Sequence, residues 1–225
     1  MGMINLKKFA EIDTDALAAR MGEGTVLSSF SVLLNSTVAM VFKTHTDDPN
    51  EHRINIKIHN RLGIQRQCSF TAVASEVVSV MLDRNVLYAF MLENSGRLSF
   101  NRLDPDTKED LLPLEQGTPV QIIPLSRDDF IIRYKDGTVT RYTDRKTEHL
   151  DPAVVSLDRN RNYIFLEGDA NGFVRLVDRS ELIYTDDNVR HNCEALFSDP
   201  VDDCFMIKDT LAVRQGGIIT VFKVN

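Results

Sequence analysis

The amino-acid sequence predicts an all-β fold in which one unit of three or four strands recurs along the chain. Runs of β-branched and aromatic residues alternate with clusters of Asn, Asp and Gly, the pattern of strands joined by tight turns. A glycine opens a strand at Gly96, Gly137, Gly172 and Gly217, with spacings of 41, 35 and 45 residues. Repeats of about 40–45 residues with three or four strands are typical of propeller blades. Because 225 residues hold about five such units, we predict a five-bladed β-propeller.

The residues that follow each glycine alternate between apolar and polar, as in a strand with one buried face. A fifth copy, without the glycine, begins at His52. Two positions after the five anchors, the residues are Ile54, Leu98, Val139, Val174 and Ile219. Four positions after them, the residues are Ile56, Phe100, Arg141, Leu176 and Val221. Arg141 is therefore the one exception to an apolar inner face.

The blades are expected at residues 24–73, 75–112, 117–150, 152–184 and 189–225. The last blade ends without an outer strand, and we expect residues 3–7 to supply it, since pairing of the two termini closes the ring and protects strand edges. One short helix is predicted at residues 13–20, capped by Asp13 or Thr14 and stopped by Gly22. No interior linker rich in Pro, Gly or Ser interrupts the chain, so residues 1–225 are predicted to be a single domain.

Residues 148–178 read as one complete unit, with strands at 153–157, 163–166 and 173–178 and a hairpin turn at Asn171-Gly172. This stretch resembles a WD40 blade. His149 stands where that family has the histidine of its Gly-His pair, Asn171 lies near its turn aspartate, and Asp178 is at its final aspartate. Glu148 and Val177 replace the family's glycine and tryptophan, and the chain has no Trp. The resemblance implies a WD40-like propeller.

Composition restricts the class of protein. The chain has no apolar run near the roughly 18 residues that a membrane helix needs, and its first residues lack a signal-peptide pattern. Three cysteines without close spacing argue for reduced thiols and against a disulfide framework or a zinc site. The net charge of −7 disfavours generic binding to nucleic acid or anionic membranes. We therefore expect a soluble, intracellular, cytoplasmic protein.

Motifs that carry catalytic chemistry are missing. The sequence has no nucleophile elbow, no phosphate-binding glycine loop and no calcium-loop spacing. His52 and His59 are an odd number of residues apart, so on one strand they would face opposite sides. No catalytic residue, metal site or cofactor is predicted. Loop carboxylates near residues 104–110 and 199–203 keep a glycosidase-like activity as the least favoured alternative.

Arginines recur in the turns that join the first and second strands of successive blades. Equivalent turns of a propeller emerge on one face, and arginine is enriched at protein interfaces. The four arginines of these turns are Arg84, Arg127, Arg159 and Arg161. They favour a non-enzymatic scaffold or adaptor that binds one or more proteins through this face.

A second basic group gives the main alternative. Residues 52–75 contain no acid and four basic side chains: Arg53, Lys57, Arg61 and Arg66. They could form a phosphate-binding strip for nucleic acid, although only Phe70 lies near them as an aromatic platform. A lectin-like ligand-binding propeller is the other alternative, and it would need repeated aromatic residues in equivalent loops.

Overall fold

The computed structural model describes residues 6–33, 36–103, 106–113, 117–136, 138–149, 155–158, 163–166, 173–178, 181–186, 189–192, 197, 199, 202–207 and 209–224. These residues divide into two compact units. We call Asp15–His149 the central unit, and Met1–Thr14 with Leu150–Asn225 the terminal unit. The secondary structure is almost entirely β, as predicted.

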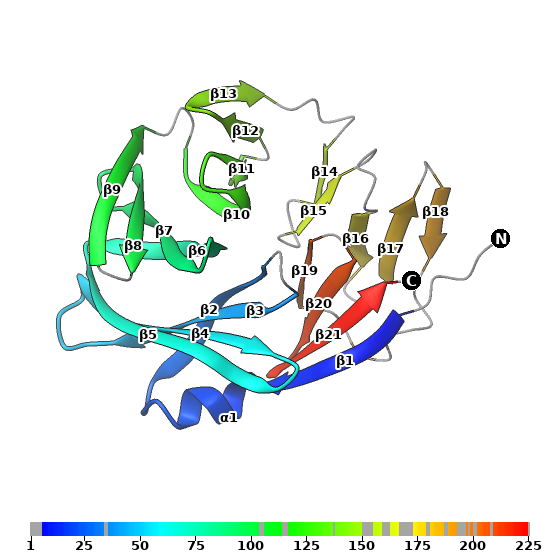
Figure 1. Ribbon diagram of the computed structural model, residues 1–225, viewed down its shortest axis with the longest axis horizontal. Helices are drawn as coiled ribbons and strands as arrows, with labels where there is room; N and C mark the ends of the chain where they lie inside the picture. Colours follow the sequence, from blue (N-terminus) through cyan, green and yellow to red (C-terminus); the bar gives the residue numbers. More distant parts are fainter. Residues whose placement is uncertain are drawn as a thin grey trace. The chain divides into compact units, whose positions relative to one another are not determined.

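The central unit consists of three antiparallel four-stranded sheets, each formed by strands in sequence order (Figure 1). The first contains β2 (Thr25–Val32), β3 (Val38–His45), β4 (Glu51–Asn60) and β5 (Gly63–Val73). The second contains β6 (Ser75–Asp83), β7 (Val86–Glu93), β8 (Arg97–Leu103) and β9 (Asp106–Pro113). The third contains β10 (Pro119–Ser126), β11 (Asp129–Tyr134), β12 (Val139–Thr143) and β13 (Lys146–His149). These sheets coincide with the blades predicted at 24–73, 75–112 and 117–150.

Apolar faces hold the three sheets of the central unit together. Between the first and second sheets, Val41, Ile54 and Ile56 belong to one core cluster with Val80 and Leu87. A second cluster joins the second and third sheets and is rich in aromatic rings: Met81, Tyr88, Phe90, Leu98, Phe100, Ile122, Phe130, Ile132, Tyr134 and Tyr142. Burial of this apolar area, rather than hydrogen bonds between sheets, accounts for their stacking.

The predicted repeat register agrees with the observed burial. Ile54, Leu98 and Ile219 are at most 2% exposed, and Val139 is also buried. Arg141, the exception, stands on β12 beside Asp129 of β11. Its Nε and Nη2 atoms donate to the two carboxylate oxygens of Asp129 at 2.9 and 2.8 Å. A bidentate ion pair in a half-exposed position lets a charged residue occupy an otherwise apolar register.

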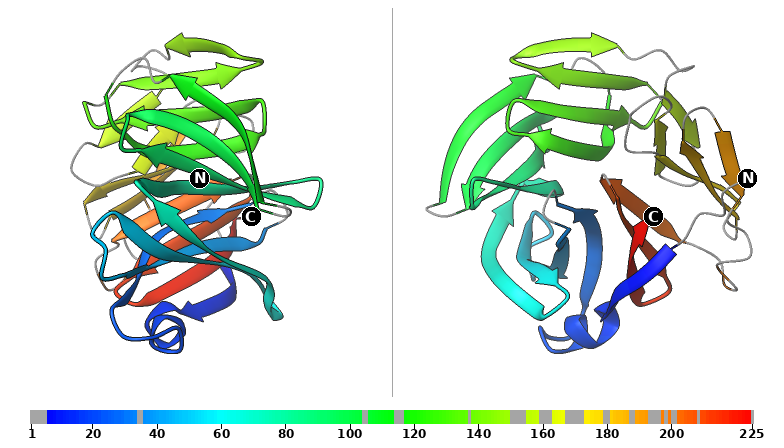
Figure 2. Two further views of the ribbon diagram at one scale, coloured as in Figure 1. Left: turned by 90° about the vertical axis from the view of Figure 1, so that its left-hand side faces the viewer. Right: turned by 45° about the vertical axis from the view of Figure 1, so that its right-hand side comes forward.

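The terminal unit contains a four-stranded sheet built from both ends of the chain, in the order β1 (Leu6–Asp13), β21 (Ile218–Val224), β20 (Thr210–Gln215) and β19 (Asp203–Ile207). β1 pairs antiparallel with β21 from Leu6↔Val224 to Asp13↔Ile218, and Figure 2 shows the blue and red strands side by side. The N-terminal segment therefore supplies the outer strand of this sheet, as predicted. Of the predicted residues 3–7, Leu6 and Lys7 belong to β1, which continues to Asp13, and residues 3–5 lie outside the described residues.

The predicted fourth blade, 152–184, differs in the structure. β14 (Val155–Asp158) pairs with β15 (Tyr163–Leu166) in one sheet, whereas β16 (Phe173–Asp178), β17 (Glu181–Asp186) and β18 (Val189–Asn192) form another. β18 falls within the last predicted blade, 189–225, but pairs with β17. Antiparallel strands pair readily across two-residue connections, which join β16 to β17 and β17 to β18. The predicted turn at Asn171-Gly172 lies outside the described residues.

The short helix α1 (Thr14–Ala19) confirms the prediction for residues 13–20. The predicted cap at Thr14 has another partner. Its backbone N–H and its Oγ1 hydroxyl both donate to the carbonyl oxygen of Gly217, at 2.8 and 2.7 Å. Thr14 thereby continues the contact between β1 and the β20–β21 turn. In the part of the chain that the structure describes, no helix has the length and apolar character needed to cross a membrane.

Ala74 joins β5 to β6 with a φ of +49°. Its N–H donates to Asn50 O, and its carbonyl accepts the N–H of Asn94, both at 2.8 Å. The residue therefore links the β3–β4 turn, the β5–β6 junction and the β7–β8 turn. Because β-branched residues strongly disfavour positive φ, Ala74→Val is expected to lower the free energy of unfolding by about 1–3 kcal/mol.

Ala74→Gly should leave stability equal or raise it by up to about 1 kcal/mol, because glycine accepts this φ without a steric penalty. Urea denaturation of both variants measures the difference. Val73→Ala, next to it on an exposed side chain, is the control for local substitution. Equal stability of the Val and Gly variants would show that the conformation at Ala74 carries no strain.

Candidate functional site

Among the residues that the structure describes, four two-residue turns of the central unit emerge at one end of its sheets. Nη1 of Arg66, close to the β4–β5 turn, donates to the carbonyl of Asn85 in the β6–β7 turn at 2.7 Å. The N–H of Asp144 in the β12–β13 turn donates to the carbonyl of Asp128 in the β10–β11 turn at 2.9 Å. The β4–β5 and β6–β7 turns therefore lie together, as do the β10–β11 and β12–β13 turns.

The position of the start of β10 shows that these two pairs of turns lie at the same end of the sheets. A small cavity is lined by Glu76, at the start of β6, by Asn94 and Gly96 of the β7–β8 turn, and by Thr118 just before β10. β10 therefore begins at the opposite end of the second sheet and finishes at the end that carries the β6–β7 turn. We call this end the turn face and define it by residues 61–62, 84–85, 127–128 and 144–145.

Two arginines of the turn face, Arg84 and Arg145, stand in tight turns with positive φ. Arg84 and Asn85 have φ values of +46° and +66°, and Asp144 and Arg145 have +48° and +64°. Two successive positive φ angles are the mark of type I′ hairpin turns, in which Asn-Gly is preferred. Placing arginine there costs conformational energy, and such costs are concentrated at functional sites. Arg84 and Arg145 are both exposed on these rigid turns.

The predicted site residues are placed as follows. Arg84 and Arg127 both lie on the turn face; Arg84 is exposed and Arg127 is half-buried. Arg159 and Arg161 lie outside the described residues. Arg145 is absent from the predicted set, because that set comes from turns between first and second strands and Arg145 stands in the β12–β13 turn. The turns between third and fourth strands, where Arg145 stands, repeat along the sequence at the same end of each sheet.

The tip of the β4–β5 hairpin adds apolar surface to the turn face. Leu62 is 79% exposed and Ile64 is 41% exposed, and Arg61 between the two strands is also exposed. Leu62 N–H donates to Oδ1 of Asn60 at 2.7 Å, which fixes the tight turn. Large apolar side chains left in water beside arginine are typical of binding surfaces. A single leucine in a turn gave no signal in the sequence.

The four residues of the predicted basic strip do not share one surface. Arg53 and Lys57 lie on the outward face of β4, where Nζ of Lys57 donates to Oε1 of Gln67 at 3.1 Å. Arg66 is paired with Ile58 and belongs to the opposite face, and Arg61 lies at the hairpin tip. The structure therefore brings Arg61 and Arg66 to the turn face and leaves Arg53 and Lys57 together on the sheet. Nucleic-acid binding by this group stays a prediction.

His45 and His52 lie at the other end of the first sheet, whereas His59 lies near the β4–β5 turn. The rings of His45 and His52 are 5.1 Å apart, with Lys43 and Glu76 paired at 2.9 Å nearby. Burial, with Lys43 and His45 close by, lowers the pKa of His52, and burial lowers the pKa of His59. Among the residues that the structure describes, no three His, Cys, Asp or Glu side chains lie close enough together to hold a metal ion.

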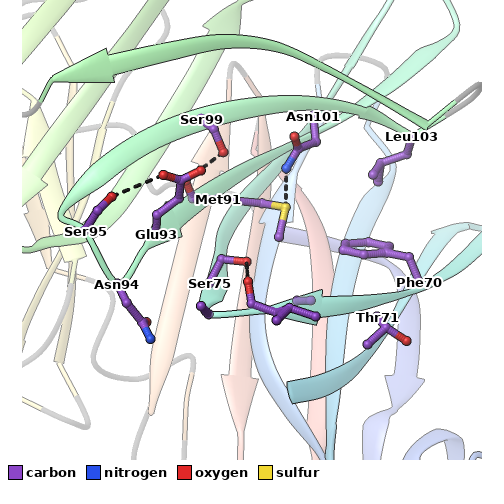
Figure 3. Close-up of a pocket in the computed structure, with 13 residues that line it drawn as sticks. Phe70, Thr71, Ser75, Met91, Glu93, Asn94, Ser95, Ser99, Asn101 and Leu103 are labelled. Atoms are coloured by element: carbon purple, nitrogen blue, oxygen red, sulfur yellow. Dashed lines mark hydrogen bonds between the residues drawn. The ribbon is translucent and has the colours of Figure 1, made fainter. Parts of the chain in front are cut away.

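A cavity of about 590 Å³ lies between β5 and the second sheet (Figure 3). Phe70, Met91 and Leu103 form its apolar part, and Ser99 and Asn101 line its polar part. The Nδ2 amide of Asn101 contacts the sulfur of Met91, and Oγ of Ser99 donates to the Met91 carbonyl at 3.4 Å. Thr71 and Ser75, on either side of the β5–β6 junction, also line the cavity. Its lining fits an apolar side chain with a polar border.

No protein-family model matches this sequence, and no curated protein matches it. Solved structures do match. A chain in the crystal structure of the mitotic checkpoint complex is 8% identical, with a TM-score of 0.51; the match covers 99% of this chain and 93% of that one. YCF48 bound to D1 peptide is 13% identical over 77% of this chain, with a TM-score of 0.40. BamB from Moraxella catarrhalis is 15% identical over 83%, with a TM-score of 0.37.

This chain spans 62% of the YCF48 chain and 64% of the BamB chain, so it is similar to less than two thirds of each. The checkpoint-complex chain is matched over nearly its whole length. That match agrees with the succession of four-stranded antiparallel sheets whose apolar faces stack on one another. At identities this low the similarity concerns the fold, and the fold of this chain is that of a diverged WD40-like β-propeller.

Proposed function

We propose that this protein is a non-enzymatic scaffold that binds one or more partner proteins through the turn face. The observation that carries the proposal is Leu62, 79% exposed at a hairpin tip beside arginines on rigid turns. An exposed leucine contributes hydrophobic free energy only when a partner buries it. Arginine side chains around such a contact supply several hydrogen bonds. Together they have the composition of an interface centre with a polar rim.

The turn face is mixed in charge, which favours a specific partner over a generic polyanion. Arg61, Arg84 and Arg145 alternate with Asp128 and Asp144. Arginines interleaved with carboxylates set the register of a complementary surface and reject partners with the wrong pattern. Because two-residue turns change little on binding, we expect docking with small backbone movements.

The proposal includes a closed ring of five blades in a single domain, residues 1–225. The sheet shared by β1 and β21 supports it, since this pairing joins the two ends of the chain. In the proposed ring, β14–β18 supply the fourth blade. A closed ring would display the turns of all blades on one face, including the turn that contains Arg159 and Arg161.

A nucleic-acid-binding propeller remains the second candidate. It is favoured by the absence of acids between residues 52 and 75 and by Arg53 and Lys57 on one face of β4. Phosphate binding through these two side chains would depend strongly on salt. The experiment below separates the two candidates, because recovered nucleic acid and recovered protein are read out together.

The test is affinity capture from the native source with wild type and the double variant Arg84→Glu, Arg127→Glu. We expect partner proteins to be lost with the double variant, because reversing two interface arginines weakens binding by tenfold or more, or about 1.4 kcal/mol. Lys135→Glu is the matched control, an exposed charge reversal in the β11–β12 turn at the opposite end of the same sheet. Equal melting temperatures establish that all the variants are folded.

Partners that persist with the double variant at wild-type levels would contradict binding at the turn face. Recovery of nucleic acid in place of protein, reduced by Arg53→Glu and Lys57→Glu, would favour the second candidate. Loss of partners with Lys135→Glu as well would mean that net charge rather than the turn face decides binding.

A further inference from the structure

β5 is an unusual outer strand. It is 11 residues long and forms the edge of the first sheet, with β4 on one side. Its sequence from Gly63 to Val73 contains one charged residue, Arg66, and no proline. Arg66 is engaged with the carbonyl of Asn85. Long, uncharged edges are open to pairing with another strand, so proteins commonly protect them.

Other outer strands in the described part of the chain carry that protection. β9 has eight residues, of which four are charged, and ends on Pro113. β1 also has eight residues and carries Lys7, Lys8, Glu11 and Asp13. β13 has only four residues, with Lys146 and Glu148 among them. The contrast singles out β5 as the edge that is left able to accept a strand.

The two faces of β5 differ in chemistry. On the outward face, Gln67, Ser69 and Thr71 are exposed, opposite Lys57, Asn55 and Arg53 of β4. On the inward face, Cys68 and Phe70 lie opposite the buried Ile56 and Ile54, and Ala72 lies opposite the half-buried His52. A strand paired with β5 would continue this alternation. One set of its side chains would lie beside Gln67, Ser69 and Thr71, one strand away from the long side chains of Arg53 and Lys57, and the other set would lie on the Phe70 side.

The inward face opens on the cavity of about 590 Å³ described above, where Phe70 and Leu103 lie on facing walls (Figure 3). Alternate side chains of an added strand would therefore reach a partly apolar pocket. Glu93 lines the same cavity, so acidic side chains are unfavourable there and apolar ones are favoured. On the outward face the preference is reversed, since Arg53 and Lys57 attract carboxylates.

We propose that β5 binds an extended segment of a partner protein by β-strand addition, and that this segment alternates acidic and apolar residues. Backbone hydrogen bonds to β5 supply affinity, and the cavity and the pair Arg53–Lys57 supply specificity. This inference rests on the proposed function in making the protein an interaction module, but it uses a surface separate from the turn face.

The probe is a synthetic octapeptide of alternating leucine and glutamate, with binding measured by fluorescence anisotropy. Wild type is expected to bind it and to reject two relatives, one with lysine in place of glutamate and one methylated on every backbone amide. Hydrogen exchange should show new protection of β5 amides with the bound octapeptide, because those amides gain partners in the added strand.

The decisive variant is Arg53→Glu, Lys57→Glu, whose two side chains are on the surface of the sheet. Its affinity for the glutamate peptide should fall by tenfold or more, and its affinity for the lysine peptide should rise by a similar factor. If Arg53 and Lys57 only stabilised the sheet, the variant would not prefer the lysine peptide over the glutamate peptide. Lys135→Glu, at a distant turn, should bind both peptides like wild type.

Unchanged preference in the charge-reversed variant, or octapeptide binding without protection of β5, would overturn the proposal. Protection of β5 by a single-stranded oligothymidylate but not by the octapeptide would assign the surface to nucleic acid instead. The Arg84→Glu, Arg127→Glu variant should bind the octapeptide normally. If it does so and also keeps every native partner, the turn-face proposal fails while the β5 site stands.

Discussion

Replacing Phe130 by alanine is expected to lower the free energy of unfolding by about 3–5 kcal/mol. Phe130 is fully buried, and its ring lies 5.2 Å from Phe90, 5.3 Å from Phe100 and 4.6 Å from Tyr142. It therefore connects aromatic residues of the second and third sheets. Its removal forfeits both the buried area and the edge and stacked ring contacts.

Urea denaturation followed by tyrosine fluorescence and circular dichroism measures this loss. Phe130→Leu, which keeps most of the apolar volume, should cost clearly less than the alanine variant. Leu62→Ala is the matched control for an apolar truncation in water, and it should change stability by no more than about 0.5 kcal/mol. A loss below about 1 kcal/mol for Phe130→Ala would mean that the aromatic cluster does not hold the two sheets together.

Deleting residues 1–13 is expected to destabilise the terminal unit by more than about 4 kcal/mol and to promote self-association. β1 covers the edge of β21 along its whole length, and Ile12, 3% exposed, packs opposite the fully buried Ile219. Without β1, the backbone groups of β21 would face water, and the strand would offer an unprotected edge to a second molecule.

Thermal unfolding and sedimentation measure the two parts of this prediction. Deletion of residues 1–5 alone is the control, because it keeps all of β1. A synthetic peptide of residues 6–13 should restore part of the lost stability when it is added in excess. If the melting temperature and the sedimentation coefficient stayed unchanged after deletion of residues 1–13, β1 would be dispensable for the terminal unit.

The repeat of the inner strands could be predicted because burial imposes a period of two on each strand. Ile54, Leu98 and Ile219 were placed correctly from glycine anchors and alternation alone. Arg141 could not be explained from its own strand, because its partner Asp129 lies on β11 and the pairing depends on register. Asp13 or Thr14 was expected to cap the helix, and the Thr14 hydroxyl donates instead to the carbonyl of Gly217, 203 residues away, which its own segment could not reveal.

Sheet membership was harder to predict than strand position. β14 to β18 were found near the expected residues, yet their grouping depends on which neighbour each strand pairs with, and several arrangements satisfy the same alternation. The residues of the candidate surfaces could likewise be predicted only in part, because their positions depend on neighbouring strands. Arg84 and Arg127 followed from turn composition, whereas Leu62 and the edge of β5 become visible only when exposure and neighbouring strands are known.

The pairing of Leu6 with Val224 also sets an order of events during synthesis. The strands of residues 15–149 find their partners within that segment, so they can assemble while the rest of the chain is still being translated. β1 leaves the ribosome well before β21, its hydrogen-bonding partner. β1 must therefore wait until β21 has been translated, and this long-range step should limit the rate at which the native protein appears.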